Sequence, residues 1–123
     1  MSEIKAISYE EAMRRFRNVY RMEKLPHEPV DAAQWYASDY SCGALVWVGK
    51  DRKKARIKGT VTTPESRGLG YGDALLRHLE SQARLQGAEG LEVYAKNPAW
   101  YLRNGWQVKR ITNWDTTVLT KNL

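Results

Sequence analysis

Nine residues near the middle of the chain, 64–72, have the types and spacing of an anion-binding turn. They read Pro-Glu-Ser-Arg-Gly-Leu-Gly-Tyr-Gly, and an apolar pattern with helical spacing follows at once. The glycines at 68, 70 and 72 permit backbone conformations and close approaches that a side chain would obstruct. Successive backbone N–H groups can then point at one anion, at the helix end that favours negative charge, with Arg67 adding a cation. Taken alone, the segment is equally compatible with a phosphate site and with an ordinary strand-to-helix turn.

Length and composition limit the class of protein. The 123 residues suffice for one domain with a modest core, and 42% hydrophobic with 28% charged residues is an ordinary globular balance. The formal net charge of +6 favours an anionic partner, either nucleic acid or a phosphorylated cofactor. Cys42 is the only cysteine, so an internal disulfide and a cysteine-based zinc site are excluded. We expect Cys42 to be a small buried group. No apolar run has the length of a membrane span and no signal-peptide pattern opens the chain, so we expect a cytoplasmic protein without a membrane partner.

The elements that must position the glycine segment begin with a strand at 4–7 and an amphipathic helix at 9–23. Ser8 and Glu11 have the spacing of a capping box at the start of this helix. Three arginines lie on its polar side, which favours a solvated surface over one that attracts anions: Arg14, Arg17 and Arg21. Two prolines then break the chain, and we predict a short second helix at 30–37.

Around the glycine segment the pattern alternates between strands and helices. Two strands joined by a polar turn predict an antiparallel hairpin, and further strands follow the glycine segment. The predicted strands are 44–48, 55–63, 91–94, 106–111 and 116–121, the last two separated by a turn at Asn113. The predicted helices are 70–86, with Gly87 as its stop, and 98–103. This order predicts a mixed α/β fold in a single domain, 1–123, with one strand–helix–strand crossover at its centre.

Three segments, in the same order along the chain, resemble the signature of the general N-acetyltransferase (GNAT) superfamily. Residues 64–72 resemble its pyrophosphate-binding loop, including the proline three residues before the arginine. Residues 91–97, Leu-Glu-Val-Tyr-Ala-Lys-Asn, are similar to the family's fifth strand and the asparagine after it. Residues 101–106, Tyr-Leu-Arg-Asn-Gly-Trp, resemble its Tyr-x-x-x-Gly-Phe element. The resemblance covers about 55–110 and implies the GNAT fold, a mostly antiparallel twisted sheet with flanking helices.

The resemblance also implies a binding site for acetyl-coenzyme A (acetyl-CoA). The strand edge that pairs with the pantetheine arm in the family is occupied here by Thr60, Val61 and Thr62. Asn97 matches a side chain that contacts the coenzyme arm. The pyrophosphate is expected to lie against Arg67 and the backbone amides of Gly68, Leu69, Gly70, Tyr71, Gly72 and Asp73.

Two residues are implied in catalysis. Tyr101 matches the tyrosine that protonates the departing coenzyme A thiolate, a task suited to a positioned acid. A backbone N–H near Val61 or Thr62 is placed to stabilise the oxyanion on the acetyl group. The run around Glu92 resembles that of N-terminal acetyltransferases of ribosomal proteins, where this residue is the general base. The alternative for Glu92 is a solvent-facing strand residue that pairs with a neighbouring Lys or Arg.

The chain departs from the family pattern in three places. Tyr101 follows Asn97 by only four positions, so either the proton donor is displaced or Asn97 is not the equivalent residue. Asp73 stands where many relatives carry a neutral or basic residue, and its charge is expected near the phosphates or as a helix cap. With only two strands predicted between the second helix and the glycine segment, the sheet is expected to be one strand short.

The sequence therefore predicts an acetyl-CoA-dependent N-acetyltransferase that transfers the acetyl group directly to a primary amine on a small molecule or a protein. A catalytically silent coenzyme A-binding module and a small basic nucleic-acid-binding domain stay open as alternatives. Tryptophans predicted to pack inside elements favour the first two over nucleic-acid binding. We place His78 on the exposed side of its helix and His27 in a loop, and neither has metal-ligand spacing, so no metal site is predicted. A C-terminal strand at a sheet edge is compatible with a homodimer.

Overall fold

The computed structural model describes residues 3–112 and 115–123, so the turn predicted at Asn113 lies outside the described residues. Its centre is a seven-stranded sheet in the order β1-β2-β3-β4-β5-β7-β6. Every neighbouring pair is antiparallel except β4 and β5, which are parallel. The strands are β1 (Lys5–Ile7), β2 (Gln34–Ala37), β3 (Ser41–Val48), β4 (Lys54–Thr62), β5 (Gly90–Ala95), β6 (Gln107–Ile111) and β7 (Thr117–Asn122). This is the mixed α/β, mostly antiparallel sheet that the sequence predicted. The C-terminal strand β7 is not at a sheet edge as expected, because it pairs with both β5 and β6.

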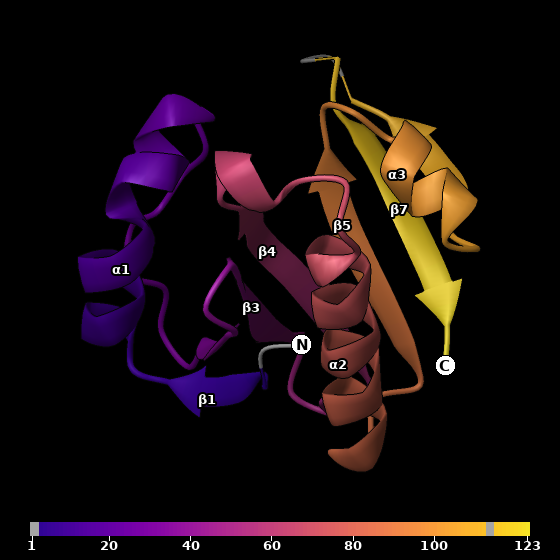
Figure 1. Cartoon of the computed structure of the whole chain (residues 1–123). Helices are drawn as coiled ribbons and strands as arrows, with labels where there is room; N and C mark the ends of the chain where they lie inside the picture. Colours follow the sequence, from indigo (N-terminus) through magenta and orange to yellow (C-terminus); the bar gives the residue numbers. More distant parts are fainter. Residues whose placement is uncertain (1–2, 113–114) are drawn as a thin grey trace.

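Helices pack on both faces of the sheet. The helices are α1 (Tyr9–Met22), α2 (Tyr71–Leu85) and α3 (Ala99–Arg103), with a 3₁₀ turn, η1 (Pro64–Ser66), before α2. Figure 1 shows α2 lying across β4 and β5, with α3 beside β7 and α1 at the β1 end of the molecule. Leu75, Leu76 and Tyr101 belong to one core, whereas Phe16 and Tyr20 of α1 belong to another. Helices α2 and α3 therefore cover one face, and α1 covers part of the other.

The start of α1 follows half of the predicted capping box. Ser8 has an extended backbone conformation, and its Oγ accepts a hydrogen bond from the Glu11 N–H at 3.0 Å. The Glu11 carboxylate bonds to the guanidinium of Arg14 instead of reaching back to Ser8. The hydroxyl therefore supplies the cap, and the side chain of Glu11 serves the exposed face of the helix.

The helix predicted at 30–37 is wrong, because residues 34–37 form strand β2 between β1 and β3. Trp35 packs in the core under α1, while its neighbour Tyr36 packs in the core under α2. Successive residues point to opposite faces only in a strand, so two adjacent buried aromatic residues that serve two cores require this conformation. The sheet is consequently not short of a strand, and that expectation is also wrong.

Strands β4 and β5 run side by side for only part of their length. Their paired residues extend from Lys54 and Gly90 to Ile57 and Val93, and the strands diverge beyond this point. An irregularity in the β3–β4 register lies opposite Gly59, which has a φ of +59°. This bulge leaves the side chain of Val61 in the α1 core. Thr60 and Thr62 instead approach α3 and α2.

The cysteine and one of the two histidines lie where the sequence predicted, and the other histidine does not. Cys42 is fully buried, as expected, and burial raises the pKa of its thiol to about 11. His27 lies in the loop after α1, stacked on the ring of Tyr20. His78 is not on an exposed surface: it is half-buried, with its ring edge-on to Tyr36 at 5.4 Å, and burial lowers its pKa. Among the helices of the described ranges, none is long and apolar enough to cross a membrane.

Candidate functional site

A cavity of about 590 Å³ lies beyond the point where β4 parts from β5. Its walls come from the end of β4, the glycine segment and the first turn of α2. Predicted coenzyme-site residues that line it are Thr60, Val61, Thr62, Arg67, Gly68, Gly70, Tyr71, Gly72 and Asp73. Residues that sequence reasoning missed complete the lining, namely Glu23, Leu25, Ser66, Trp100 and Arg103. The fold therefore gathers the end of α1, the glycine segment and α3 around one space.

The glycine segment forms an open turn at the start of α2. Gly68 and Gly70 have φ values of +78° and +88°, a region that favours glycine. A Cβ atom at either position would meet no protein atom within 4 Å. Gly70 is the N-cap of α2 and provides no side-chain cap. Within the described residues, the backbone N–H groups of 68–73 make no hydrogen bond to backbone or side chain. Several donors therefore face an open space where a phosphate fits.

Charged side chains of both signs border this turn. The guanidinium of Arg67 pairs with the Glu23 carboxylate at the end of α1, and its Nε donates to the Thr62 carbonyl at 3.3 Å. Arg103, at the end of α3, is exposed at the same cavity. A phosphate that enters would meet two guanidinium groups and two carboxylates, those of Glu23 and Asp73, and Glu23 competes with the anion for Arg67.

Tyr101 lies between two tryptophan rings, beside the place where β4 and β5 diverge beyond Ile57 and Val93. We call this place the split. Its ring centroid lies 4.9 Å from that of Trp100 and 5.4 Å from that of Trp106, both edge-on, and the residue is only 8% exposed. Its hydroxyl lies 3.4 Å from Thr60 Oγ1. Burial raises the pKa of Tyr101, and the bond to Thr60 offsets part of that rise. The hydroxyl is therefore protonated at neutral pH. The short interval after Asn97 does not keep it from the split.

Asp73 connects the first turn of α2 to α3. Its Oδ1 accepts a hydrogen bond from Trp100 Nε1 at 2.6 Å and one from Asn104 Nδ2 at 3.5 Å. Asn104 also donates to the Trp100 carbonyl at 2.8 Å. These partners flank Tyr101 in sequence. The unusual carboxylate at this position thus holds the helix that carries Tyr101, in addition to lining the cavity.

Glu92 lies on the opposite face of the sheet from α2 and is only 5% exposed. It sits directly across from Arg56 on the neighbouring strand. Its Oε1 accepts hydrogen bonds from Arg56 Nε at 2.9 Å and Nη2 at 2.6 Å. The two bonds end on one oxygen, and Oε2 is left for another partner. Glu92 thus forms an ion pair with Arg56 through one carboxylate oxygen. Its other carboxylate oxygen has no hydrogen bond within the described residues, and Glu92 directly precedes Val93, the last β5 residue that pairs with β4.

Four predicted site residues do not line the cavity: Leu69, Asn97 and the two catalytic candidates, Tyr101 and Glu92. Leu69 is 64% exposed and is not among the lining residues. Asn97 is also exposed and does not line the cavity. Leu69 can still contribute its backbone amide, whereas the side-chain contact proposed for Asn97 has no counterpart in this cavity.

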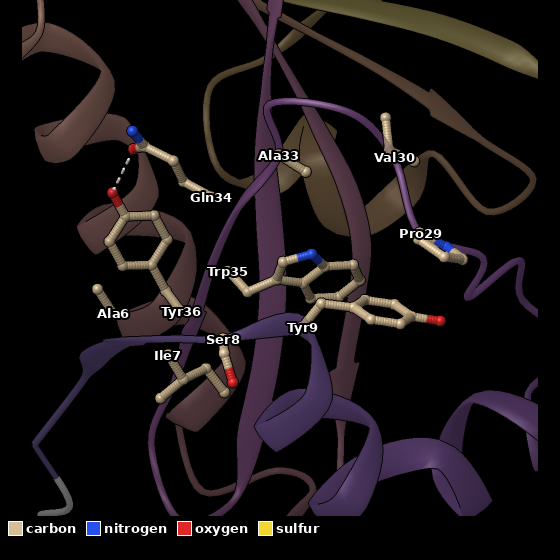
Figure 2. Close-up of a pocket in the computed structure, with 10 residues that line it drawn as sticks. All are labelled: Ala6, Ile7, Ser8, Tyr9, Pro29, Val30, Ala33, Gln34, Trp35 and Tyr36. Atoms are coloured by element: carbon tan, nitrogen blue, oxygen red, sulfur yellow. Dashed lines mark hydrogen bonds between the residues drawn. The ribbon is translucent and has the colours of Figure 1, made fainter.

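A second cavity, of about 440 Å³, lies between β1, β2 and the loop before β2. Figure 2 shows Trp35 and Tyr9 side by side in it, while Tyr36 turns away and donates to Gln34 Oε1 at 2.9 Å. None of the predicted site residues lines it. The described residues also hold no group of three His, Cys, Asp or Glu side chains arranged as metal ligands. Two of the three motifs, 64–72 and 101–106, therefore contribute residues to the first cavity, and none of the three lines the second.

Residues 31–108 match the family model of the acetyltransferase (GNAT) domain. The chain belongs to the GNAT acetyltransferase family. It is accordingly an acyltransferase, with acetyl-CoA as its cosubstrate. The free amides of the glycine turn, and the space in front of them, fit a pyrophosphate.

Solved structures share the fold of this GNAT chain at low sequence identity. A protein from Klebsiella pneumoniae described as an acyl-CoA N-acyltransferase is 22% identical, with a TM-score of 0.81 over 100% of this chain and 98% of that one. N-acetylglutamate synthase from Neisseria gonorrhoeae, complexed with coenzyme A and L-arginine, is 19% identical, with a TM-score of 0.79 over 98% of this chain and 33% of that one. Rv2747 from Mycobacterium tuberculosis, in complex with coenzyme A, is 13% identical, with a TM-score of 0.77 over 98% and 99% of the two chains. No curated protein shows significant sequence similarity.

Proposed function

We propose that the protein transfers an acetyl group from acetyl-CoA directly to a primary amine. The observation that carries this proposal is the Tyr101 hydroxyl, protonated and 3.4 Å from Thr60 Oγ1, beside a cavity whose other end is the glycine turn. A phosphate-binding turn alone suits many ligands. A buried acid next to it, at a split in a sheet, suits a reaction in which a phosphate-bearing leaving group must take up a proton.

The residues divide the binding of the cosubstrate between them. The N–H groups of 68–73 and the guanidinium groups of Arg67 and Arg103 suit the pyrophosphate. Beyond Ile57, the β5-facing edge of β4 has no paired strand in the described part of the chain, so Thr60 to Thr62 can offer backbone groups to the pantetheine amides. An N–H near Val61 or Thr62 is then available to the carbonyl oxygen of the acetyl group.

The proposed reaction moves one acetyl group and one proton. The amine nitrogen forms a bond to the thioester carbonyl carbon, and the carbon–sulfur bond breaks. Tyr101 donates its proton to the departing sulfur. Glu92, through its Oε2, or water accepts the proton that the amine loses. The products are an acetylated amine and the free coenzyme A thiol.

A pair of glycine variants tests where the coenzyme binds. Gly70 and Gly87 lie at opposite ends of α2, both have positive φ, and a Cβ at either would meet no atom within 4 Å. Ala at either position strains the backbone similarly, yet only Gly70 lines the cavity. Coenzyme A at 100 times its dissociation constant should stabilise the wild type and Gly87→Ala by about 2.7 kcal/mol. Gly70→Ala should lose most of this. Equal protection of both variants would place the coenzyme elsewhere.

Thiol release with a panel of primary amines tests transfer itself. The proposed function requires free coenzyme A thiol to appear in proportion to acetylated amine. Protection by coenzyme A without thiol release from any amine would instead identify a silent coenzyme A-binding module.

A further inference from the structure

We propose that the acceptor is an amine that also carries a carboxylate, held by basic side chains on the sheet face opposite α2. This inference rests on the proposed function and identifies the substrate class of the same site. It concerns the face that bears Arg56 and Glu92, which we call the basic face and define by Lys54, Arg56, Lys58, Glu92, Tyr94 and Arg110.

The location follows from the face on which we propose that the coenzyme binds. The glycine turn, Trp100 and Tyr101, which we propose bind the coenzyme and supply the proton, lie on the α2 and α3 side, and the cavity extends from them to Glu23 and Leu25 after α1. The acceptor can then reach the split from the other side of the sheet. Lys58 and Tyr94 are the first residues on the basic face beyond the last β4–β5 pair, Ile57 and Val93. They therefore flank the opening of the split on the side where an acceptor would arrive.

The basic face has an excess of positive charge. Lys54, Arg56 and Lys58 alternate along β4 and so project to the same side, and Arg110 joins them from β6. The only carboxylate in this set, Glu92, is engaged with Arg56. Within the described residues, no ion pair forms to Lys58 or to Arg110. Helix α1 covers a different part of this side of the sheet, packing on Trp35, Ala44 and Val61. Two cations thus remain available beside the split.

Arg110 is held in place by an aromatic platform. Its Nη2 donates to the Tyr94 hydroxyl at 3.2 Å, and its Cζ lies 5.9 Å from the centroid of the Tyr94 ring. The Cζ of Arg56 lies 4.8 Å from the same ring, so Tyr94 contacts both guanidinium groups. Tyr94 is nevertheless 44% exposed. A guanidinium fixed in this way retains donors for a carboxylate, which it can bind in a bidentate manner. The acceptor amine would then point into the split, toward Glu92 Oε2.

Matched acceptors test the requirement for a carboxylate. Thiol release is measured with each common amino acid and with its α-carboxamide, which keeps the amine but lacks that charge. A second set uses short peptides that begin with Asp or Glu, against the same peptides with Asn or Gln, and so separates free amino acids from acidic protein ends. In at least one pair, the carboxylate member should show a kcat/KM at least about tenfold higher.

The outcomes separate this inference from the proposed function. Carboxamides used as well as, or better than, their carboxylate partners would overturn the inference. The same holds if no carboxylate-bearing amine reacts while coenzyme A still binds. Failure of coenzyme A to bind would instead refute the proposed function.

Charge-removing variants test whether the carboxylate of the acceptor binds to the basic face. Arg110→Gln and Lys58→Gln should each raise KM for the carboxylate acceptor about tenfold, with a smaller change in kcat, and leave the carboxamide unaffected. Arg84→Gln, exposed in the last turn of α2, removes the same charge elsewhere and serves as the matched control. Normal KM values in both basic-face variants, with wild-type melting temperatures, would overturn the assignment.

Discussion

Tyr101 shows how burial prepares a single side chain for proton donation. Replacement by Phe keeps the ring between Trp100 and Trp106 but removes the proton beside Thr60. We expect Tyr101→Phe to lower kcat by about 100-fold or more and to leave coenzyme A protection unchanged. Because burial raises the pKa of Tyr101 above its usual value, loss of its proton should not limit kcat between about pH 6 and 9. A kcat of Tyr101→Phe equal to that of the wild type throughout that range would contradict the proposed role.

Glu92 and Arg56 form a partly buried ion pair whose structural role can be separated from catalysis. Removing one member leaves the other unpaired, so Arg56→Gln and Glu92→Gln should each cost about 1–3 kcal/mol, below the cost for a fully buried pair because Arg56 is partly exposed. The double variant should cost less than the sum of the two single variants, as urea unfolding would measure. Additive costs would show that the pair does not stabilise the fold.

The same set of variants tests Glu92 as a general base. If the carboxylate takes the proton of the amine, Glu92→Gln should lower kcat at about pH 7 far more than Arg56→Gln does, even though both weaken the same ion pair. Equal effects on kcat would leave water as the proton acceptor.

His78 links a single ring to the pH dependence of stability. Burial against Tyr36 lowers the pKa of His78, so the folded protein favours the neutral imidazole. The contribution of His78 to the free energy of unfolding is present above the pKa of about 6.5 that the ring has in the unfolded chain. It is lost as the pH falls through the lowered pKa of the folded protein. The melting temperature of the wild type should therefore fall further between about pH 8 and pH 5 than that of His78→Phe, which keeps the ring. Parallel profiles would exclude this contribution.

At the scale of elements, hydrogen bonds between α2 and α3 fix the position of Tyr101, which follows Asn97 by only four positions. Asp73 receives hydrogen bonds from Trp100 and Asn104, on either side of Tyr101. Asp73→Ala should release α3, lower kcat about tenfold or more, and change the fluorescence of Trp100, because a misplaced donor transfers its proton poorly. Asp73→Asn retains an acceptor oxygen and should recover part of the loss. If both variants lost coenzyme A binding with kcat at saturation unchanged, Asp73 would act on the cavity and not on α3.

The elements also show what a single sequence can predict. Signals confined to a few neighbouring residues, such as Ser8 before α1 and Gly87 after α2, placed those elements correctly. Strand β2 was misassigned because Trp35 and Tyr36 serve different cores, and neither core is visible in a local pattern. Three of the missed lining residues, Glu23, Trp100 and Arg103, meet the glycine turn only through the tertiary fold. The ordered motifs pointed to the cavity that we propose for the coenzyme because they mark the central crossover, whose geometry follows from parallel strands joined by a helix.

At the scale of the molecule, the partial separation of β4 and β5 gives the sheet two chemically different sides at one point. On one side lie free amides, Arg67, Arg103 and a buried acid, which suit a phosphate-bearing cosubstrate. On the other lie Glu92 and the cations of the basic face. In the proposed reaction the two substrates arrive from opposite faces and meet where the pairing of β4 and β5 ends, after Ile57 and Val93.

The net charge of +6 acts on the cosubstrate before any contact forms. An anionic coenzyme should be attracted over about 10 Å at 0.1 M salt but only about 3 Å at 1 M, so its association rate constant should fall as salt rises. Stopped-flow fluorescence can follow this, since Trp100 lines the cavity. Arg17→Gln combined with Arg21→Gln removes two charges from α1, whose end reaches the cavity at Glu23.

The matched control for that pair combines Lys5→Gln with Lys53→Gln, which lowers the net charge equally. Lys53 precedes β4, at the opposite end of this strand from Thr62. The α1 pair should slow association more than the control pair and flatten its salt dependence, because the field at the cavity depends on nearby charges more than on distant ones. Equal slowing by both pairs would mean that total charge alone attracts the coenzyme, and the arginine side of α1 would then be an ordinary solvated surface.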